Sequence, residues 1–381
     1  MKEVFEEAAN QLNNQHSLVV ATVIRTKGST PQKPGAKLLV KDDGSGVGTL
    51  GGGCVEGDIW YAAKQLMKNR GEAKTIGYEL NEKIAAQDGL VCGGTMYFLI
   101  DPMYDKGQDA LFLDEINQAY LGGEPVALAS LIKGTSEFDG EIGCKLLIRD
   151  DGSIEGTLGE ESLNAEAAQL AVELMAYGNS KYVKSATGGE YFIEGYTTPP
   201  RVVLCGGGHV SKAISTVAIN LGFNLIVIDD REEFANKKRF PEADVVVAST
   251  SAEGFKSIEV NKNTFIVIAT RGHRYDHVAL EAALNTSASY IGLLGSKRKT
   301  ILIYEELLHR GISIDRIKDV RAPIGLDINA RTPEEIAISI MAEILMIRNG
   351  GGGGTMKLDP NLLNKASAKV FGNKADVKIG S

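Results

Sequence analysis

One cysteine stands at the predicted start of a helix, where residue type and position together favour chemistry. Cys54 is followed by apolar residues at helical spacing through residue 68, and it is preceded by Gly51, Gly52 and Gly53. Exposed N–H groups and the dipole at a helix start attract anions and lower the pKa of a thiol. A thiolate is a soft metal ligand and a nucleophile, and Glu56 adds a carboxylate that could accept a proton. The alternative is that Cys54 is a small buried apolar residue beside a tight glycine turn.

A second group of reactive side chains follows a predicted strand at residues 264–269. His273, Asp276 and His277 have the spacing H-x-x-D-H, which could hold a divalent ion or perform acid–base chemistry. The alternative is that Asp276 only caps a helix and that His277 points away from the site. We therefore assign no metal, and we expect a polar ligand-contacting role for His273 and Asp276.

A glycine-rich turn lies between a strand, a helix and a second strand at residues 201–230. Gly206 allows a tight turn, Gly207 follows it, and Gly208 lets N–H groups approach a pyrophosphate at the helix start. Asp229 lies 21 positions after Gly208, where an acid that binds ribose is expected. Ser211 replaces the third glycine of the usual pattern, so an empty or repurposed crevice is the alternative.

A basic triplet follows the last predicted strand, at residues 289–294. Lys297, Arg298 and Lys299 stand at the start of a helix, where they could clamp a phosphate. The alternative is a charged face that contacts only solvent.

The elements that must position these groups are predicted to form an α/β fold. Apolar runs at residues 243–248, 264–269 and 289–294, with helices between them, indicate a parallel sheet buried on both faces. We predict a Rossmann-like, doubly wound parallel sheet with strand order 3-2-1-4-5. Its ligand crevice should lie at the carboxyl ends of strands one and four.

An α+β domain built from two related halves precedes this sheet. Residues 18–70 and 126–178 repeat each other at a constant offset of 108, as from Lys37 to Lys145. The halves differ at the helix start: the second half carries Glu160 and Glu161 where the first has glycines. Because two carboxylates repel an anion, only the first half suits an anionic ligand.

The domain boundaries follow from these patterns. We predict an α+β domain at residues 1–195, a linker at 196–200, the Rossmann-like domain at 201–349, and a glycine-rich linker and flexible tail at 350–381. A homodimer is expected, because an α+β domain this short needs help to cover its sheet.

Composition excludes several classes of function. The net charge of −8 argues against a nucleic-acid partner, and no apolar stretch is long enough to span a membrane. The four cysteines have no paired C-x-x-C spacing, and the first residues form an acidic amphipathic segment rather than a signal peptide. We expect a cytoplasmic protein with reduced thiols. Cys92 beside its glycine pair could face Cys54, whereas Cys144 and Cys205 adjoin strands as core residues.

An ordered set of motifs resembles the XdhC/CoxI family of accessory factors for xanthine dehydrogenase and related molybdenum hydroxylases. The motifs are TKGSTP (26–31), GTLGGGCVEG (48–57), VCGG (91–94), PPRVVLCGGGHV (199–210), DDR (229–231), TRGHRYD (270–276), YIGLLGSKRK (290–299), PIGLDI (323–328) and TPEEIAISIMAE (332–343). The resemblance spans nearly the whole chain from residue 19 to residue 348.

This resemblance implies a chaperone that binds molybdenum cofactor (molybdopterin) transiently and delivers it to an apo molybdenum hydroxylase such as xanthine dehydrogenase. It places Cys54 and Glu56 near the molybdenum, in a cleft between the domains, with Cys54 as a transient contact. The glycine turn and Asp229 would hold a nucleotide or the pterin phosphate. His209 and Arg231 belong to the same motifs and are expected to contact the cofactor.

Two alternatives remain open from the sequence. The first is an NAD(P)-dependent oxidoreductase, favoured by the strand–turn–helix unit with its acid. The second is a sulfurtransferase that uses Cys54, because the cofactor carries a terminal sulfide. A cysteine desulfurase or another cofactor-maturation protein would then be a partner.

Overall fold

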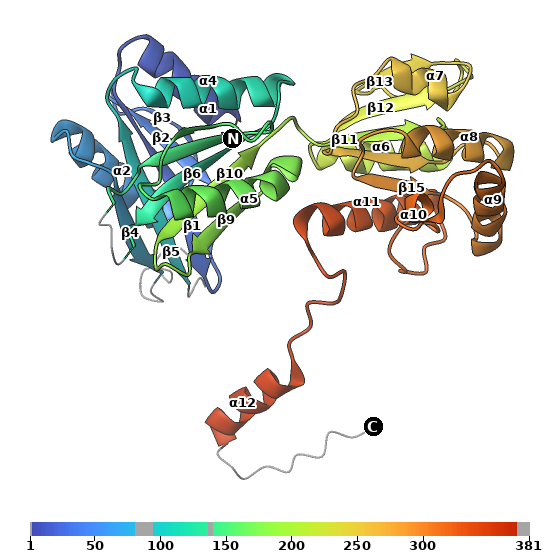
Figure 1. The fold of residues 1–381 in the computed structure, drawn as a ribbon. Coiled ribbons are helices and arrows are strands. Elements are labelled where there is room, and N and C mark those ends of the chain that lie inside the picture. Colours follow the sequence, from blue (N-terminus) through green and yellow to red (C-terminus); the bar gives the residue numbers. More distant parts are fainter. Residues whose placement is uncertain (1, 81–93, 136–139, 372–381) are drawn as a thin grey trace.

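The computed structural model describes residues 2–80, 94–135 and 140–371 of the chain. The helices and strands form an N-terminal unit and a C-terminal unit, which lie side by side and are joined after β10 (Figure 1). The predicted fold class is confirmed: antiparallel sheets in the N-terminal part precede a parallel five-stranded sheet.

Two five-stranded antiparallel sheets make up the N-terminal unit, and they have the same topology. Their strand orders are β3-β2-β1-β5-β4 and β8-β7-β6-β10-β9. The first sheet contains β1 (Leu18–Lys27), β2 (Lys37–Lys41), β3 (Gly46–Gly48), β4 (Lys74–Glu79) and β5 (Thr95–Met103). The second contains β6 (Val126–Lys133), β7 (Lys145–Arg149), β8 (Ile154–Gly156), β9 (Ser180–Lys184) and β10 (Glu190–Tyr196).

Helices cover each sheet of the N-terminal unit on one face. The helix α2 (Gly53–Lys68) packs on the first sheet and α5 (Glu161–Tyr177) on the second, each over its own apolar core. The helices α1 (Lys2–Asn13) and α4 (Gln108–Leu121) pack together in a core shared by both sheets. Apolar side chains from both sheets also meet directly, including Leu99 and Phe192. The two halves therefore form one packed unit.

The C-terminal sheet is parallel, with the order β13-β12-β11-β14-β15, which confirms the predicted order 3-2-1-4-5. Its strands are β11 (Arg201–Cys205), β12 (Asn224–Asp229), β13 (Asp244–Val247), β14 (Thr264–Ile268) and β15 (Tyr290–Leu293). The central strand β11 is almost completely buried, as expected for a sheet covered on both faces.

Helices cover both faces of this sheet. One face packs against α6 (His209–Asn220) and α11 (Pro333–Asn349), and the other packs against α7 (Ser251–Lys256), α8 (His273–Leu284) and α9 (Lys297–His309). A capping box starts α11: Thr332 accepts a hydrogen bond from the N–H of Glu335, and the Glu335 carboxylate accepts one from the N–H of Thr332. A short helix α10 (Ile314–Ile317) follows α9.

The two units touch where α5 ends. The Asn179 side chain donates to the carbonyl of Arg348 at 3.1 Å, and the Arg348 guanidinium donates to the carbonyl of Tyr177 at 3.0 Å. The Tyr177 ring also stacks near Phe265 of β14.

The predicted flexible tail contains a further helix, α12 (Pro360–Phe371), which lies apart from both units (Figure 1). Two of its leucines, Leu362 and Leu363, are exposed. Among the described residues, no helix combines the length and the apolar character needed to cross a membrane.

Candidate cofactor-binding sites

Cys54 is an exposed residue in the first turn of α2. The preceding glycines all have left-handed φ angles, with 107° at Gly51, 74° at Gly52 and 68° at Gly53. Three consecutive residues of this kind favour glycine strongly, because side chains strain this conformation. Gly52 is the N-cap and supplies no side-chain hydrogen bond to the first N–H groups of the helix, and Glu56 is the acidic residue of this first turn. The alternative of a buried apolar Cys54 is wrong.

Glu56 holds the turn that precedes the helix. Its Oε2 atom accepts hydrogen bonds from the Thr49 hydroxyl at 2.7 Å, from the Leu50 N–H at 2.8 Å and from the Gly52 N–H at 3.2 Å. Burial alone would raise the pKa of Glu56, but these hydrogen bonds outweigh it and lower the pKa. A carboxylate with a lowered pKa is a weak base. We therefore interpret Glu56 as a residue that positions the glycine turn, and not as one that accepts a proton.

The second half builds the same turn with a neutral side chain. Asn164, which is 108 residues after Glu56, accepts from the Leu158 N–H at 2.8 Å and donates to the Thr157 hydroxyl at 3.1 Å. The helix start of α5 has Glu160 as its N-cap, with Glu161 following in the first turn. The turn is therefore common to both halves, and the glycines and the thiol are particular to the first.

Two further segments surround the α2 turn. A Cβ atom on Gly51 would lie 2.7 Å from Cβ of Pro31, and one on Gly94 would lie 2.4 Å from the carbonyl oxygen of Ser29. The segment at residues 28–31, part of the motif TKGSTP, thus lies against both glycines. Cys92, which could face Cys54 in our prediction, lies outside the described residues.

The glycine turn of the C-terminal unit has the expected conformation. Gly206 has φ of 110°, and a Cβ atom there would lie 2.3 Å from the carbonyl oxygen of Ala269. Gly208 has open space at its Cβ position, and His209 is the exposed first residue of α6. Ser211, in the place of the third glycine, is completely buried.

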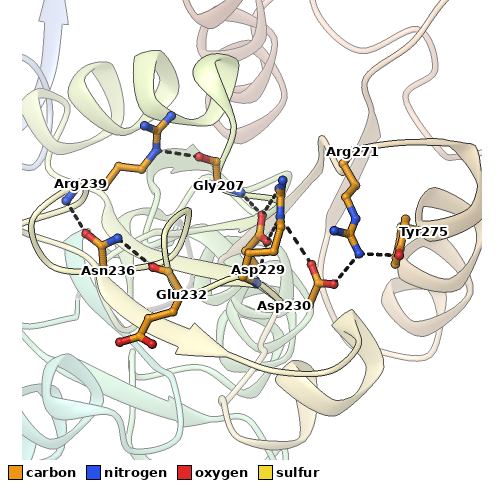
Figure 2. A network of polar contacts seen from close by, with 9 residues as sticks. Gly207, Asp229, Asp230, Glu232, Asn236, Arg239, Arg271 and Tyr275 are labelled. Carbon is orange, nitrogen blue, oxygen red and sulfur yellow. Dashed lines mark hydrogen bonds and ion pairs between the residues drawn. The ribbon is translucent and has the colours of Figure 1, made fainter.

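Asp229 is directed at this turn from the end of β12 (Figure 2). One oxygen accepts from the Gly207 N–H at 2.7 Å, and the carboxylate also accepts from the Arg231 backbone N–H at 3.0 Å. The Arg231 guanidinium donates to both oxygens, at 2.9 and 3.0 Å. Only 3% of the Asp229 side chain is exposed. Its oxygens therefore accept hydrogen bonds from the turn and from Arg231, and they are not presented to a ribose.

Arginine side chains close the rest of the crevice. Arg271 forms an ion pair with Asp230 at 2.7 Å and donates to the Tyr275 hydroxyl (Figure 2). Arg239 donates to the carbonyl of Gly207 at 2.8 Å. The remaining cavity, beside Gly206, measures about 30 Å³, which is room for a water molecule rather than a nucleotide. Sequence patterns did not identify Arg239 or Arg271 as part of this site.

Asp276 lies in α8, where no part of its side chain is exposed. It accepts from the Thr270 hydroxyl at 2.7 Å and forms an ion pair with Lys299 at 2.5 Å. His273 is the first residue of α8, but its side chain is not among those described. Within the described ranges, no group of three or more acidic, histidine or cysteine residues is placed to hold a metal ion.

Of the basic triplet, Lys297 and Arg298 are exposed at the start of α9, whereas Lys299 reaches Asp276. Lys299 also donates to the carbonyl of Leu294 at 3.2 Å. The residue that contacts the candidate site is therefore the third of the triplet. Helical spacing from the Ser296 N-cap was the only sequence signal that could have distinguished it.

The structure does not bring the two candidate sites into one cleft. The helix α2 lies on the side of the N-terminal unit away from the C-terminal unit, and α8 and α9 lie at the opposite end of the molecule (Figure 1). The predicted cleft containing both Cys54 and the crevice of the parallel sheet is therefore wrong for a single chain. The reason is that β10 ends at Tyr196 and β11 begins at Arg201, so the N-terminal unit is joined to the amino end of β11 and the crevice lies at the other end of that strand.

Comparison with known proteins matches both units to one family. A model described as the XdhC and CoxI family matches residues 11–79 and 120–185, and one described as the XdhC Rossmann domain matches residues 202–344. The crystal structure of a xanthine dehydrogenase from Bacillus halodurans is similar with a TM-score of 0.63 and 26% identity, covering 92% of this chain and 98% of that one.

Curated relatives extend the comparison. The protein YqeB of Escherichia coli is 36% identical over 56% of this chain, which spans only 42% of that relative's length. A protein of Bacillus subtilis named as a probable xanthine dehydrogenase subunit is 25% identical, covering 88% of this chain and 95% of the relative. The molybdenum cofactor insertion chaperone PaoD of Escherichia coli is 22% identical, covering 91% and 88%. Because the family models match both units in order, the chain belongs to the XdhC and CoxI family.

Proposed function

We propose that this chain is an accessory protein of a xanthine dehydrogenase-type molybdenum hydroxylase, which binds molybdenum cofactor and delivers it to the apo-enzyme. The observation that carries the proposal is the exposed thiol of Cys54 at a helix start formed by three glycines. One relative is named as a probable xanthine dehydrogenase subunit and another as a molybdenum cofactor insertion chaperone, and both names support molybdenum cofactor as the molecule delivered, which we call the cargo.

The α2 helix start fits the chemistry of this cargo. The cofactor carries a phosphate and a soft metal ligated by sulfur, and a helix start attracts the first while a thiolate contacts the second. Glu56 keeps the glycine turn in place through its three hydrogen bonds, so it would position the site rather than react. In the second half, Glu160 and Glu161 would repel the phosphate.

The role of the parallel sheet is narrower in this proposal. Gly207 and Asp229 bond each other, and a cavity of about 30 Å³ remains in the crevice, so a nucleotide could enter only if Arg231 and Arg271 moved. The NAD(P)-dependent oxidoreductase alternative has less support for that reason. The cysteine desulfurase partner and the homodimer expected from the sequence have no support in these findings.

The proposal is tested by the molybdenum and pterin content of the purified protein and by activation of an apo molybdenum hydroxylase. Cys54→Ala should lower the molybdenum content about tenfold and lower activation in proportion, because the soft contact is lost. Ser162 occupies the equivalent position of the second half, 108 residues later, so Ser162→Ala is the matched control and should leave both unchanged.

Two results would contradict parts of the proposal. Equal molybdenum content and activation for Cys54→Ala and the unaltered protein would remove the thiol from the mechanism. A purified protein that holds no molybdenum or pterin, but whose melting temperature rises with NAD(P), would favour the oxidoreductase alternative instead.

A further inference from the structure

Two hollows open where the halves of the N-terminal unit meet. The first hollow, of about 440 Å³, is lined by residues 32–37, 178–180 and 194–196. The second hollow, of about 490 Å³, is lined by residues 70–72, 101–102 and 141–145. Most of these segments correspond through the offset of 108 residues. The hollows are therefore equivalent positions of the two halves, and either is large enough for a small molecule.

Each hollow has a buried ion pair that joins the two halves. In the first hollow, Lys37 of the first half pairs with Glu194 of the second at 2.5 Å. In the second hollow, Lys145 of the second half pairs with Asp101 of the first at 2.9 Å and also with Asp109 at 2.8 Å. Asp101 and Glu194 hold equivalent strand positions, opposite Val20 and Leu128. The same kind of buried ion pair between the halves therefore occurs twice, at equivalent positions.

The charges around the hollows differ. The first hollow is lined by two lysines, Lys33 and Lys37, and by one acid, Glu194. The second hollow is lined by two basic residues and five acids, which are Arg70, Lys145, Glu72, Asp101, Asp105, Asp109 and Glu141. The first hollow thus suits an anionic ligand, which the second would repel.

Glu194 offers one carboxylate oxygen to the first hollow. Its Oε2 atom accepts from Lys37 at 2.5 Å and from the Tyr196 hydroxyl at 3.0 Å. Within the described part of the chain, Oε1 accepts no hydrogen bond, and it lies 3.6 Å from the position of a Cβ atom on Gly35. The Ser180 hydroxyl lies 3.5 Å from the same position. A ligand ring whose edge presents N–H groups next to a carbonyl fits this pair: the N–H groups can donate to Glu194, and the carbonyl can accept from the Ser180 hydroxyl.

The first hollow also borders the α2 turn. Thr49 lines the hollow and donates to Glu56, the residue that holds the turn. Gln32 lines it too, and its Cγ atom lies 3.3 Å from the position of a Cβ atom on Gly51. The turn that carries Cys54 therefore shares its inner wall with the hollow.

We propose that the first hollow binds an anionic planar heterocycle through an aminopyrimidinone edge, with Glu194 accepting from the ring N–H groups and Ser180 bonding the adjacent ring atoms. Pterins and guanine nucleotides share this edge. The identification with the pterin of the cargo rests on the proposed function.

The test is the fluorescence anisotropy of pterin-6-carboxylate titrated with the full-length protein, with GMP as a competitor. Ser180→Tyr fills the first hollow, and Glu72→Tyr fills the equivalent position of the second. We expect Ser180→Tyr to weaken binding at least about tenfold and Glu72→Tyr to leave it within about twofold. Glu194→Gln should weaken binding about tenfold and Asp101→Asn should not, since both disturb a buried ion pair but only one faces the ligand. Melting temperatures verify that each variant is folded.

The outcomes separate this inference from the proposed function. Binding that is equal in Ser180→Tyr, Glu194→Gln and the unaltered protein, or lost equally in Glu72→Tyr, overturns the hollow as the site. Absence of pterin binding in the unaltered protein overturns it as well. If the same preparations still contain molybdenum, the proposed function survives that result. A dissociation constant for GMP, obtained from its displacement of pterin-6-carboxylate, that is lower than the constant of pterin-6-carboxylate itself would assign the hollow to a guanine nucleotide instead of the molybdenum cofactor.

Discussion

Removal of the Asp229 carboxylate should destabilise the C-terminal unit and leave the N-terminal unit unchanged. Asp229 is 3% exposed, and it accepts hydrogen bonds from the backbone of Gly207 and from the backbone and guanidinium of Arg231. In Asp229→Ala, the buried Gly207 N–H would lose its acceptor, at a cost of about 1–3 kcal/mol. The Arg231 side chain is 23% exposed, so the loss of its ion pair with Asp229 adds no more than about 1 kcal/mol to that cost.

Together these contributions lower the free energy of unfolding of the C-terminal unit by about 1–4 kcal/mol, which corresponds to a melting temperature lower by roughly 2–16 °C for a unit of this length. The chain has one tryptophan, Trp60, which lies in α2 of the N-terminal unit. Tryptophan fluorescence therefore reports the N-terminal unit, whereas far-UV circular dichroism reports both. Asp229→Ala should shift a transition seen by circular dichroism and leave the fluorescence transition in place.

Asp230→Ala is the matched control, because Asp230 is 28% exposed and its ion pair with Arg271 is worth less than about 1 kcal/mol. The reasoning is refuted if Asp229→Ala melts within about 1 °C of the unaltered protein, or no lower than Asp230→Ala. It is also refuted if the fluorescence transition moves as far as the circular dichroism transition.

The stabilisation that the Asp229 carboxylate provides should depend on pH. Burial alone would raise the pKa of Asp229, but hydrogen bonds from Arg231 and Gly207 outweigh it and lower the pKa. The folded-state pKa then lies below the unfolded value of about 4, so the stabilisation is complete above that pH and is lost as the pH falls through the folded-state pKa. The difference in melting temperature between the unaltered protein and Asp229→Ala should be constant from about pH 5 to 8 and narrow below about pH 4.

Two further predictions concern side chains that the sequence presents alike but the structure separates. Lys299→Met should lower the free energy of unfolding by about 2–3 kcal/mol in chemical denaturation, because it leaves the buried Asp276 carboxylate without its cationic partner. Lys297 is exposed, so Lys297→Met should change the free energy of unfolding by less than about 0.5 kcal/mol. Equal effects of the two substitutions would contradict the assignment of Lys299 as the partner of Asp276. Cys54 should react rapidly with a thiol reagent such as DTNB in the native protein and Cys205 should not, because Cys205 is fully buried and burial raises its pKa to about 12. Because Cys144 is half-buried, the comparison is made in a Cys92→Ser, Cys144→Ser background; a fast phase that persists there in Cys54→Ala would contradict the exposed-thiol assignment.

Local patterns were enough to predict most of the architecture. Apolar runs with helices between them indicated a parallel sheet, and the glycine turn followed by Asp229 placed β11 and β12 at its centre. The constant offset between Lys37 and Lys145 indicated two related halves, which the structure builds as sheets of the same strand order. These features are readable because residues near in sequence determine them through hydrophobic periodicity and turn chemistry.

Contacts between distant residues were decided only by the tertiary structure. Lys37 meets Glu194 across 157 positions, and no local pattern identifies that carboxylate as its partner. The direction of Asp229 toward Gly207, instead of toward an open crevice, depends on where Arg231 and its neighbours pack. The separation of Cys54 from that crevice follows from how the two units join. The sequence by itself therefore determined which groups could react, and the packing of the units decided which of them share a site.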